Sequence, residues 1–416
     1  MNLATIQRSI PVPAKGCLRP LTDLLVVIKG LPRAIWVLYI GTFLNKFGTF
    51  VVPFLALYMT RQGYSLAQAG TAIGAYGAGH LLASIIGGHL ADSIGRRNTI
   101  VLSMFSTAIA MVLLSYAPSF WMIVLLSGCA GLTGELYRPA SMALIADLTP
   151  PGHRTAASAA YRVALNAGWA FGPATAGFLA ESSFQWLFFG DAFTSFLFGI
   201  VALKLLPHGL RGQTKQVKWS AAFKAMRLDR QFTRLCFANL LIALVFFQMA
   251  SSYGLHVTQA GFSSSTYGML ISVNGLLVVV FEILIVTYAQ RFPAKYMIFL
   301  GYCLIGLGFG LNAFSFTIPM LVLSMCIFTL GEMISMPVGA GFISELAPPA
   351  MRGRYMGTLG FTWATAMMFG PGLGMQLFLA GPTLLWLTCA SLGIGAGLVV
   401  LQGLSSPNAR TVSVAE

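Results

Sequence analysis

The chain has 416 residues, of which 57% are apolar and only 9% are charged, and its mean hydropathy is +0.79. Soluble globular proteins carry about 25% charged residues, so this composition excludes a soluble protein and predicts one embedded in a lipid bilayer. The net charge of +14 does not indicate a nucleic-acid partner, because most Lys and Arg residues lie in short connections between apolar segments.

Twelve apolar segments are long enough to cross a bilayer, which takes about 20 residues in a helix. We predict an all-α membrane protein with helices at about 35–60, 66–90, 98–117, 119–146, 157–180, 184–206, 232–256, 265–289, 296–315, 317–345, 354–379 and 382–403. The chain then divides into an N-terminal tail at 1–33, a six-helix bundle at 34–206, a basic linker at 207–231, a second six-helix bundle at 232–403 and a C-terminal tail at 404–416.

The two groups of six helices share an internal repeat. Residues 134–154 read G-E-L-Y-R-P-A-S-M-A-L-I-A-D-L-T-P-P-G-H-R, and residues 331–352 read G-E-M-I-S-M-P-V-G-A-G-F-I-S-E-L-A-P-P-A-M-R. A spacing of 198 residues separates the matched pairs Asp147 and Glu345, Arg154 and Arg352, and Pro173 and Pro371. A constant spacing of this kind indicates two homologous halves, and therefore two pseudo-symmetric bundles.

The distribution of basic residues predicts the orientation of the chain. The tails and every second connection together hold 21 of the 25 Lys and Arg residues, whereas the opposite side holds only Arg61. The remaining three, Lys46, Arg138 and Arg162, lie within predicted helices. Because basic connections stay in the cytoplasm, we expect a multi-pass protein of the cell membrane with both termini cytoplasmic.

The short connection after the second helix contains a distinctive motif. It reads Gly88-x-Leu90-Ala91-Asp92-x-x-Gly95-Arg96-Arg97. Gly95 suits a tight turn, and Asp92 can accept hydrogen bonds at a helix N-terminus. One arginine can reach a carboxylate. A plain basic turn would explain the motif equally well if it stood alone.

Together with the repeat, this motif resembles the signature of the major facilitator superfamily, and the resemblance covers the whole chain. In that family the motif latches the outward-open state by contacting the eleventh helix and an acidic residue that ends the fourth. The resemblance therefore implies a conformational latch made by Gly88, Asp92, Gly95, Arg96 and Arg97, with Asp147 and residues near 354–357 as partners. The second-half copy, at 286–295, has lost the pattern.

The fifth predicted helix carries Gly168-x-x-x-Gly172-Pro173-x-x-x-Gly177. Small residues at this spacing let helices approach closely, so ordinary packing is one interpretation. The other is a partial match to the antiporter motif of drug/proton antiporters in this superfamily. The arginine that those relatives carry early in the fourth helix is absent or replaced by Arg138, since Ser127 stands at its position.

Seven charged residues lie inside predicted helices, where an isolated charge costs at least about 3 kcal/mol. They are Lys46, Glu135, Arg138, Arg162, Asp191, Glu282 and Glu332. They can be structural pairs, such as Glu135 with Arg138. Alternatively, the acidic ones are candidates for proton coupling, because a carboxyl group in an apolar site exchanges its proton nearer neutral pH.

Glu135 and Glu332 stand out among these carboxylates because they occupy equivalent positions of the repeat. Glu332 is the stronger candidate for the proton carrier, since no basic residue lies near it in sequence. Asp191 and Glu282 are further candidates. If Lys46, Arg138 and Arg162 are paired, the site is largely apolar; if two or more face it, they can anchor an anionic substrate.

The sequence predicts a secondary transporter and not an enzyme. No nucleotide-binding or metalloprotease motif occurs, the six cysteines form no metal pattern, and we expect no cofactor. The preferred function is proton-coupled efflux of hydrophobic or amphipathic molecules. The alternatives are a proton-coupled transporter of an anionic metabolite and a non-transporting sensor or scaffold. The expected partners are a small molecule, protons and lipid, and the resemblance implies a monomer.

Overall fold

The computed structural model describes residues 30–150, 154–207, 228–289, 291–314, 317–347 and 352–403. These residues form helices joined by short turns, and no strand occurs among them. In chain order the elements are α2 (Arg33–Phe47), α3 (Val51–Arg61), α4 (Leu66–Ser93), α5 (Arg96–Ser115), α6 (Phe120–Glu135), α7 (Tyr137–Leu148), α8 (Arg154–Ser182), α9 (Gln185–Leu205), α11 (Arg230–Phe246), η3 (Phe247–Ala250), α12 (Ser252–Gln259), α13 (Ser264–Ala289), α14 (Ala294–Gly310), η4 (Leu311–Phe314), α15 (Ile318–Leu346), α16 (Arg352–Ala380) and α17 (Pro382–Gly403). Most of tail 1–33, most of linker 207–231 and all of tail 404–416 lie outside the described residues.

Three of the predicted helices are interrupted. The first divides into α2 and α3 at Gly48, where a Cβ atom would lie 1.7 Å from the Thr194 hydroxyl oxygen. The fourth divides into α6 and α7 at Leu136, close to Pro139, whose ring disfavours a continuous helix. The seventh divides into α11, η3 and α12. Hydropathy located these segments but not their breaks.

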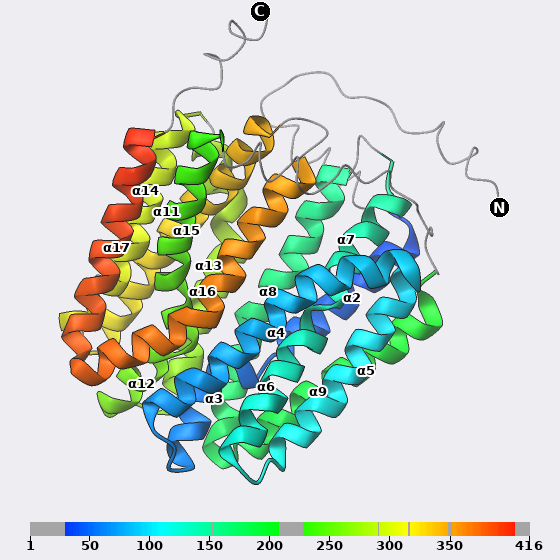
Figure 1. The fold of residues 1–416 in the computed structure, drawn as a ribbon, viewed down its shortest axis with the longest axis horizontal. Helices are drawn as coiled ribbons and strands as arrows, with labels where there is room; N and C mark the ends of the chain where they lie inside the picture. The colour runs from blue at the N-terminus through cyan, green and yellow to red at the C-terminus, as the bar shows by residue number, and fades with distance from the viewer. Residues whose placement is uncertain are drawn as a thin grey trace, which may run out of the picture.

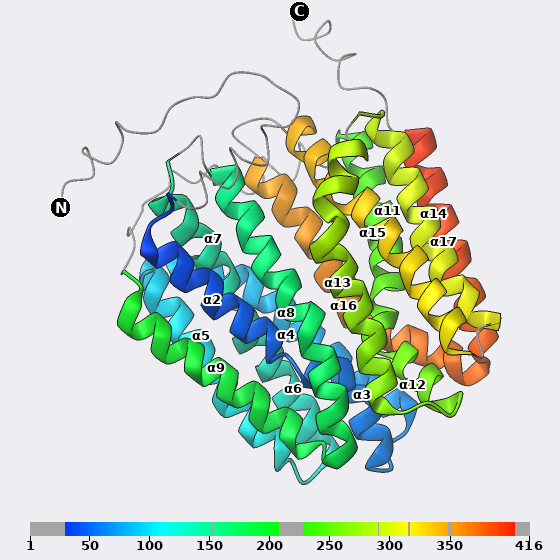
Figure 2. The same ribbon diagram turned by 180° about the vertical axis from the view of Figure 1, so that it is seen from behind.

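The helices form two bundles, shown side by side in Figure 1. Elements α2 to α9 contact one another, and so do α11 to α17. The bundles meet through the pairs α8–α13, α4–α16 and α3–α12, and Figure 2 shows α8 and α13 lying along each other. The six-plus-six arrangement predicted from the repeat is therefore confirmed.

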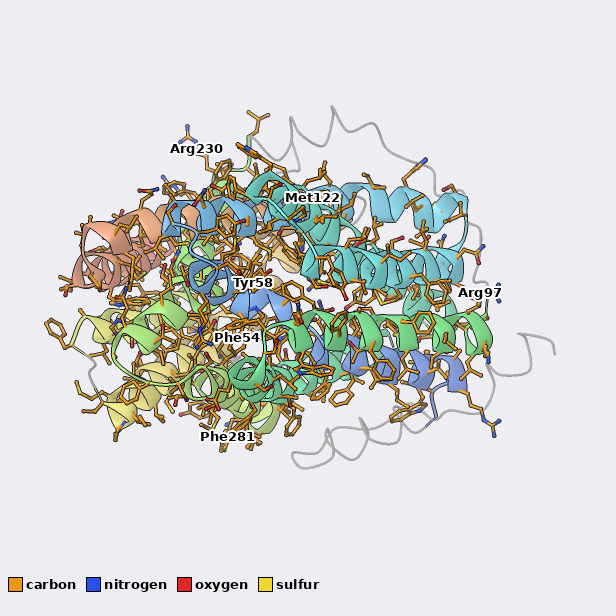
Figure 3. The ribbon with its side chains drawn as sticks, turned by 90° about the horizontal axis from the view of Figure 1, so that it is seen from below. Phe54, Tyr58, Arg97, Met122, Arg230 and Phe281 are labelled. Carbon is orange, nitrogen blue, oxygen red and sulfur yellow. The ribbon has the colours of Figure 1, made fainter. Side chains whose placement is uncertain are left out.

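The bundles touch most closely at the end where α3 and α12 lie, which we call the α3–α12 end. A Cβ atom on Gly70 of α4 would lie 2.9 Å from Cα of Gly372 in α16. One on Gly268 of α13 would lie 2.2 Å from the Pro173 carbonyl oxygen in α8. Figure 3 is drawn from this end and places Phe54 of α3 between the bundles. In the other half of α16, a Cβ on Gly360 would meet no atom within 4 Å.

Ten helical segments of the described chain are long and apolar enough to cross a membrane. The two remaining long helices, α8 and α16, have 29 residues each, which at 1.5 Å per residue is also sufficient. Large apolar side chains cover the periphery, and Figure 3 shows Met122 and Phe281 on this outer surface, each more than 40% exposed. The molecule is thus a multi-pass, all-α membrane protein.

Candidate functional site

Three of the predicted intramembrane charges form one cluster in the first bundle. The Lys46 ammonium of α2 lies 2.8 Å from the Glu135 carboxylate at the end of α6. Arg138 of α7 lies 3.9 Å from the other oxygen of Glu135, with 53% of its side chain exposed. Lys46 and Glu135 are both buried. The closest partner of Glu135 is therefore Lys46, 89 residues away, and Arg138 is its looser neighbour.

Two features of the fold position this cluster. They are the break between α6 and α7 and the glycines of α8. Glu135 is the last residue of α6, so it projects where the helix path changes. Gly168 of α8 lies against Lys46, where an added Cβ would be 2.7 Å from the Cβ of that lysine. This close approach brings α2 deep enough for the Lys46 ammonium to reach Glu135. The ammonium also lies 5.7 Å from the centre of the Tyr137 ring.

Asp191 of α9 is buried elsewhere in the same bundle. Its carboxylate lies at the backbone amides of Phe50 and Val51, which begin α3, and near the Ser195 hydroxyl. The N-terminus of a helix favours an anion because its amides point outward and its dipole is positive there. This geometry gives Asp191 a structural partner at the break of the first predicted helix.

Glu332 of α15 has a different environment from Glu135. Its carboxylate accepts a 2.8 Å hydrogen bond from the Asn274 side-chain amide of α13. The same amide donates to the Thr329 hydroxyl at 3.0 Å. No ion pair to Glu332 occurs within the described ranges. The two repeat-equivalent carboxylates thus differ: Glu135 contacts cations, whereas Glu332 contacts an amide.

The last two predicted charges form an ion pair between the bundles. The Arg162 guanidinium of α8 contacts the Glu282 carboxylate of α13, and the Asn166 amide donates to that carboxylate at 3.3 Å. About half of the Arg162 side chain is exposed. These residues lie 120 positions apart, so the pairing could not be read from local spacing.

The predicted latch residues make their contacts within the first bundle. Arg96 lies 2.8 Å from the Asp92 carboxylate and 3.3 Å from Asp147 at the end of α7. Gly95 has a φ of +96°, a conformation that glycine adopts without strain. An added Cβ on Gly88 would meet no atom within 4 Å. The predicted contact with the start of α16 involves Arg354, whose side chain is outside the described set.

The glycines of α8 face two different partners. Gly168 and Gly172 lie against the backbone of Lys46 and Phe47 in α2, within one bundle. Pro173 and Gly177 instead lie against α13, across the interface between the bundles. The motif therefore serves packing within a bundle at one end and contact between bundles at the other.

Sequence reasoning missed Asn166 and Asn274. Both are carboxamides inside predicted spanning helices, and each donates a hydrogen bond to a candidate carboxylate. The available signal was an uncompensated polar residue in an apolar stretch: Asn274 lies in α13, the candidate span with the highest hydropathy. Within the described ranges, no three His, Cys, Asp or Glu side chains gather as ligands for a metal ion.

Comparison with known proteins finds a family model and relatives that match most of the chain. The family model of the Major Facilitator Superfamily matches residues 38–263 and 235–416. The uncharacterized MFS-type transporter YqjV of Bacillus subtilis (strain 168) is 28% identical over 85% of this chain and 91% of its own length. A Na⁺, Li⁺, K⁺/H⁺ antiporter of Planococcus maritimus is 25% identical over 83% of this chain and 89% of its own.

Two further similarities bear on drug transport and on the fold. The multidrug resistance protein MdtH of Aeromonas hydrophila is 25% identical over 88% of this chain and 94% of its own length. A crystal structure of a D-xylose–proton symporter superposes with a TM-score of 0.77 at 16% identity, over 94% of this chain and all of that one. The second likeness supports the arrangement of helices alone.

Proposed function

The chain belongs to the Major Facilitator Superfamily and is a secondary transporter rather than an enzyme, and we propose that it exports hydrophobic or amphipathic small molecules in exchange for protons. Transporters built from two related bundles work by alternating access: the bundles rock about a site near the middle of the membrane. The substrate and the proton then occupy that site in turn.

The contrast between Glu135 and Glu332 carries the proposal. Lys46 at 2.8 Å and Arg138 at 3.9 Å keep Glu135 in an ion cluster, and an adjacent cation favours the charged form of a carboxylate. Glu332 contacts an amide instead of a cation. It can therefore bind and release a proton without leaving a buried cation unpaired, which suits a proton carrier.

Charge pairing supports an apolar substrate. Lys46 is paired with Glu135, and Arg162 with Glu282. Of the three cations within spanning helices, Arg138 and Arg162 have half-exposed side chains, but only Arg138 is held by a long contact, 3.9 Å from Glu135. This leaves little positive charge to hold an anionic metabolite. The similarity to a protein named for multidrug resistance agrees with this substrate class.

Transport in everted vesicles tests the proposal. The vesicles are energised, and the accumulation of lipophilic dyes is followed with and without an uncoupler. We expect uncoupler-sensitive accumulation that Glu332→Gln abolishes. Asp229→Asn is the matched control, because it also neutralises a carboxylate but leaves a good helix cap at the start of α11. Accumulation that survives in Glu332→Gln would move the carrier to Glu282 or Asp191.

Export of alkali cations is a second candidate. The carboxylates of Glu282 in α13 and Glu332 in α15 belong to helices that pack together and interact electrostatically, and carboxylate oxygens suit hard cations. A relative with this activity is similar over most of the chain. The same vesicles, assayed with Li⁺ and without dye, distinguish the two. Proton release driven by Li⁺ alone would favour cation exchange.

The proposed orientation places both termini in the cytoplasm, so the closed α3–α12 end faces outward. In this arrangement the Arg96 contacts with Asp92 and Asp147 lie at the cytoplasmic ends of α4, α5 and α7. We propose that they form half of a latch that engages α16 when the cytoplasmic side closes. The protein acts as a monomer in this proposal, because each chain contains both bundles.

A further inference from the structure

Asn274 holds Glu332 through a hydrogen bond whose direction the surrounding network fixes. The Thr329 hydroxyl donates its proton to the Met325 carbonyl at 2.7 Å, so toward Asn274 it can only accept. The Asn274 group facing Thr329 is therefore the NH₂ group. The second hydrogen of that group points at the Glu332 carboxylate, 2.8 Å away. Asn274 is 7% exposed.

The helix that carries Asn274 is also the one that contacts the other bundle. Gly275, the next residue, lies so close to α8 that an added Cβ would be 2.5 Å from Cα of Ala170. Farther along α13, Glu282 pairs with Arg162 of α8. Figure 2 shows α13 between α8 and α15. A change in the bond between α13 and α15 therefore acts on a helix at the interface of the two bundles.

We propose that Asn274 is a positioning residue that couples the proton on Glu332 to the movement of α13 against α8. This inference rests on the proposed function. A hydrogen bond to an ionised carboxylate is roughly twice as strong as one to a neutral group. Proton binding to Glu332 thus weakens the link between α13 and α15, and proton release restores it.

The other groups around Glu332 are compatible with this role. Glu282 of α13 and Arg162 of α8 act on it electrostatically, and they are paired with each other. From α14, the backbone at Gly301 and Ile305 approaches Gly331, the residue before Glu332. That approach brings no charge. Asn274 is therefore the direct polar contact from α13, the helix that links Glu332 to the other bundle.

The test is the pH dependence of dye accumulation in Asn274→Ala. Removing the donor disfavours ionised Glu332, so we expect the profile to move toward alkaline pH by about one to two units. Asn239→Ala is the matched control: Asn239 of α11 donates to Thr362 of α16, away from Glu332. We expect it to leave the profile in place. A folded Asn274→Ala protein with reduced activity and the wild-type pH profile would show a merely structural role and overturn the proposal.

Two further variants keep the test decisive. Asn274→Asp preserves the size of the side chain but faces Glu332 with a second carboxyl group, so its profile should move in the same alkaline direction. If Asn274→Ala fails to assemble, as judged by gel filtration in detergent, this variant decides, and an unshifted profile overturns the proposal. Glu332→Gln, with and without Asn274→Ala, separates this proposal from the proposed function, because both proteins should lack uncoupler-sensitive accumulation. Accumulation with the wild-type pH profile in Glu332→Gln alone would refute the carrier assignment.

Discussion

At the scale of single residues, the Lys46–Glu135 pair is the buried ion pair whose loss should cost the first bundle most stability. Both side chains are at most 10% exposed. Burying two charges costs several kcal/mol per ion, which their attraction offsets only while both are present. The pair therefore contributes less to net stability than its 2.8 Å contact suggests, but either charge alone is costly.

Neutralising one partner of this pair should destabilise the protein. Glu135→Gln leaves the Lys46 ammonium buried without its carboxylate, and we expect a loss of about 3–5 kcal/mol, seen as a lower melting temperature in detergent. The double variant Lys46→Met/Glu135→Leu removes both charges and should recover most of that loss. A single variant as stable as the double one would contradict the assignment of a buried ion pair.

The seven candidate charges were named from sequence, but most of their partners were not, because a charge inside an apolar segment is conspicuous whereas its neighbours from other helices are not. Which residues they contact depends on how distant helices pack: Lys46 meets Glu135 across 89 positions, and Arg162 meets Glu282 across the bundle interface. The local pairing of Glu135 with Arg138 is present but is the longer contact.

At the scale of elements, the glycines of α8 make two kinds of packing contact, one within a bundle and one between bundles. Their spacing in the sequence does not distinguish the two. Gly168 faces α2, where an added Cβ would be 2.7 Å from the Phe47 backbone nitrogen. Gly177 faces α13, where an added Cβ would be 2.8 Å from the Ser264 carbonyl oxygen. The first contact lies within one bundle, whereas the second has to separate when the bundles rock apart.

Alanine at these two positions should therefore have different effects. Gly168→Ala overpacks a fixed contact and should lower stability by about 1–3 kcal/mol. Gly177→Ala should leave the melting temperature closer to wild type and should favour the conformation that opens at the α3–α12 end. Thermal unfolding measures the first effect, and thiol accessibility at that end measures the second. Gly360→Ala, which adds a Cβ into open space, is the control and should change neither.

Hydropathy predicted each spanning segment to within a few residues. In lipid the backbone amides and carbonyls of an apolar run have no water to bind, and a helix pairs them within the segment. The interruptions at Gly48, Leu136 and Phe247 were not predicted. At Gly48 the chain passes close to a neighbour remote in sequence, the Thr194 side chain of α9. A tertiary contact of this kind leaves no periodic signal along the chain.

At the scale of the whole molecule, the α3–α12 end is closed by polar contacts as well as by close packing. Arg61 of α3 donates to the Ser264 hydroxyl at 3.3 Å, and the Ser265 amide donates to Glu181 of α8 at 3.2 Å. Tyr267 of α13 donates to the carbonyls of Pro53 at 2.9 Å and Met249 at 2.8 Å. The Pro53 contact joins the two bundles and exists only while this end is closed.

Removing the Tyr267 hydroxyl should therefore shift the balance between the two conformations. The single Tyr267 hydroxyl hydrogen is shared between Pro53 and Met249, so in Tyr267→Phe the closed end loses at most one hydrogen bond worth about 1 kcal/mol. The population should therefore change by up to roughly fivefold. The probe is Ser264→Cys in a cysteine-free background, since Ser264 is 1% exposed here and lies against Gly177 of the other bundle. A membrane-impermeant maleimide, added outside the cell, should label this cysteine several-fold faster when Tyr267→Phe is present.

Thr258→Val, whose hydroxyl bonds only within α12, should leave the rate unchanged. An equal rate in all three proteins would mean that the tyrosine does not hold this end closed. Labelling only from the cytoplasmic side would reverse the proposed orientation.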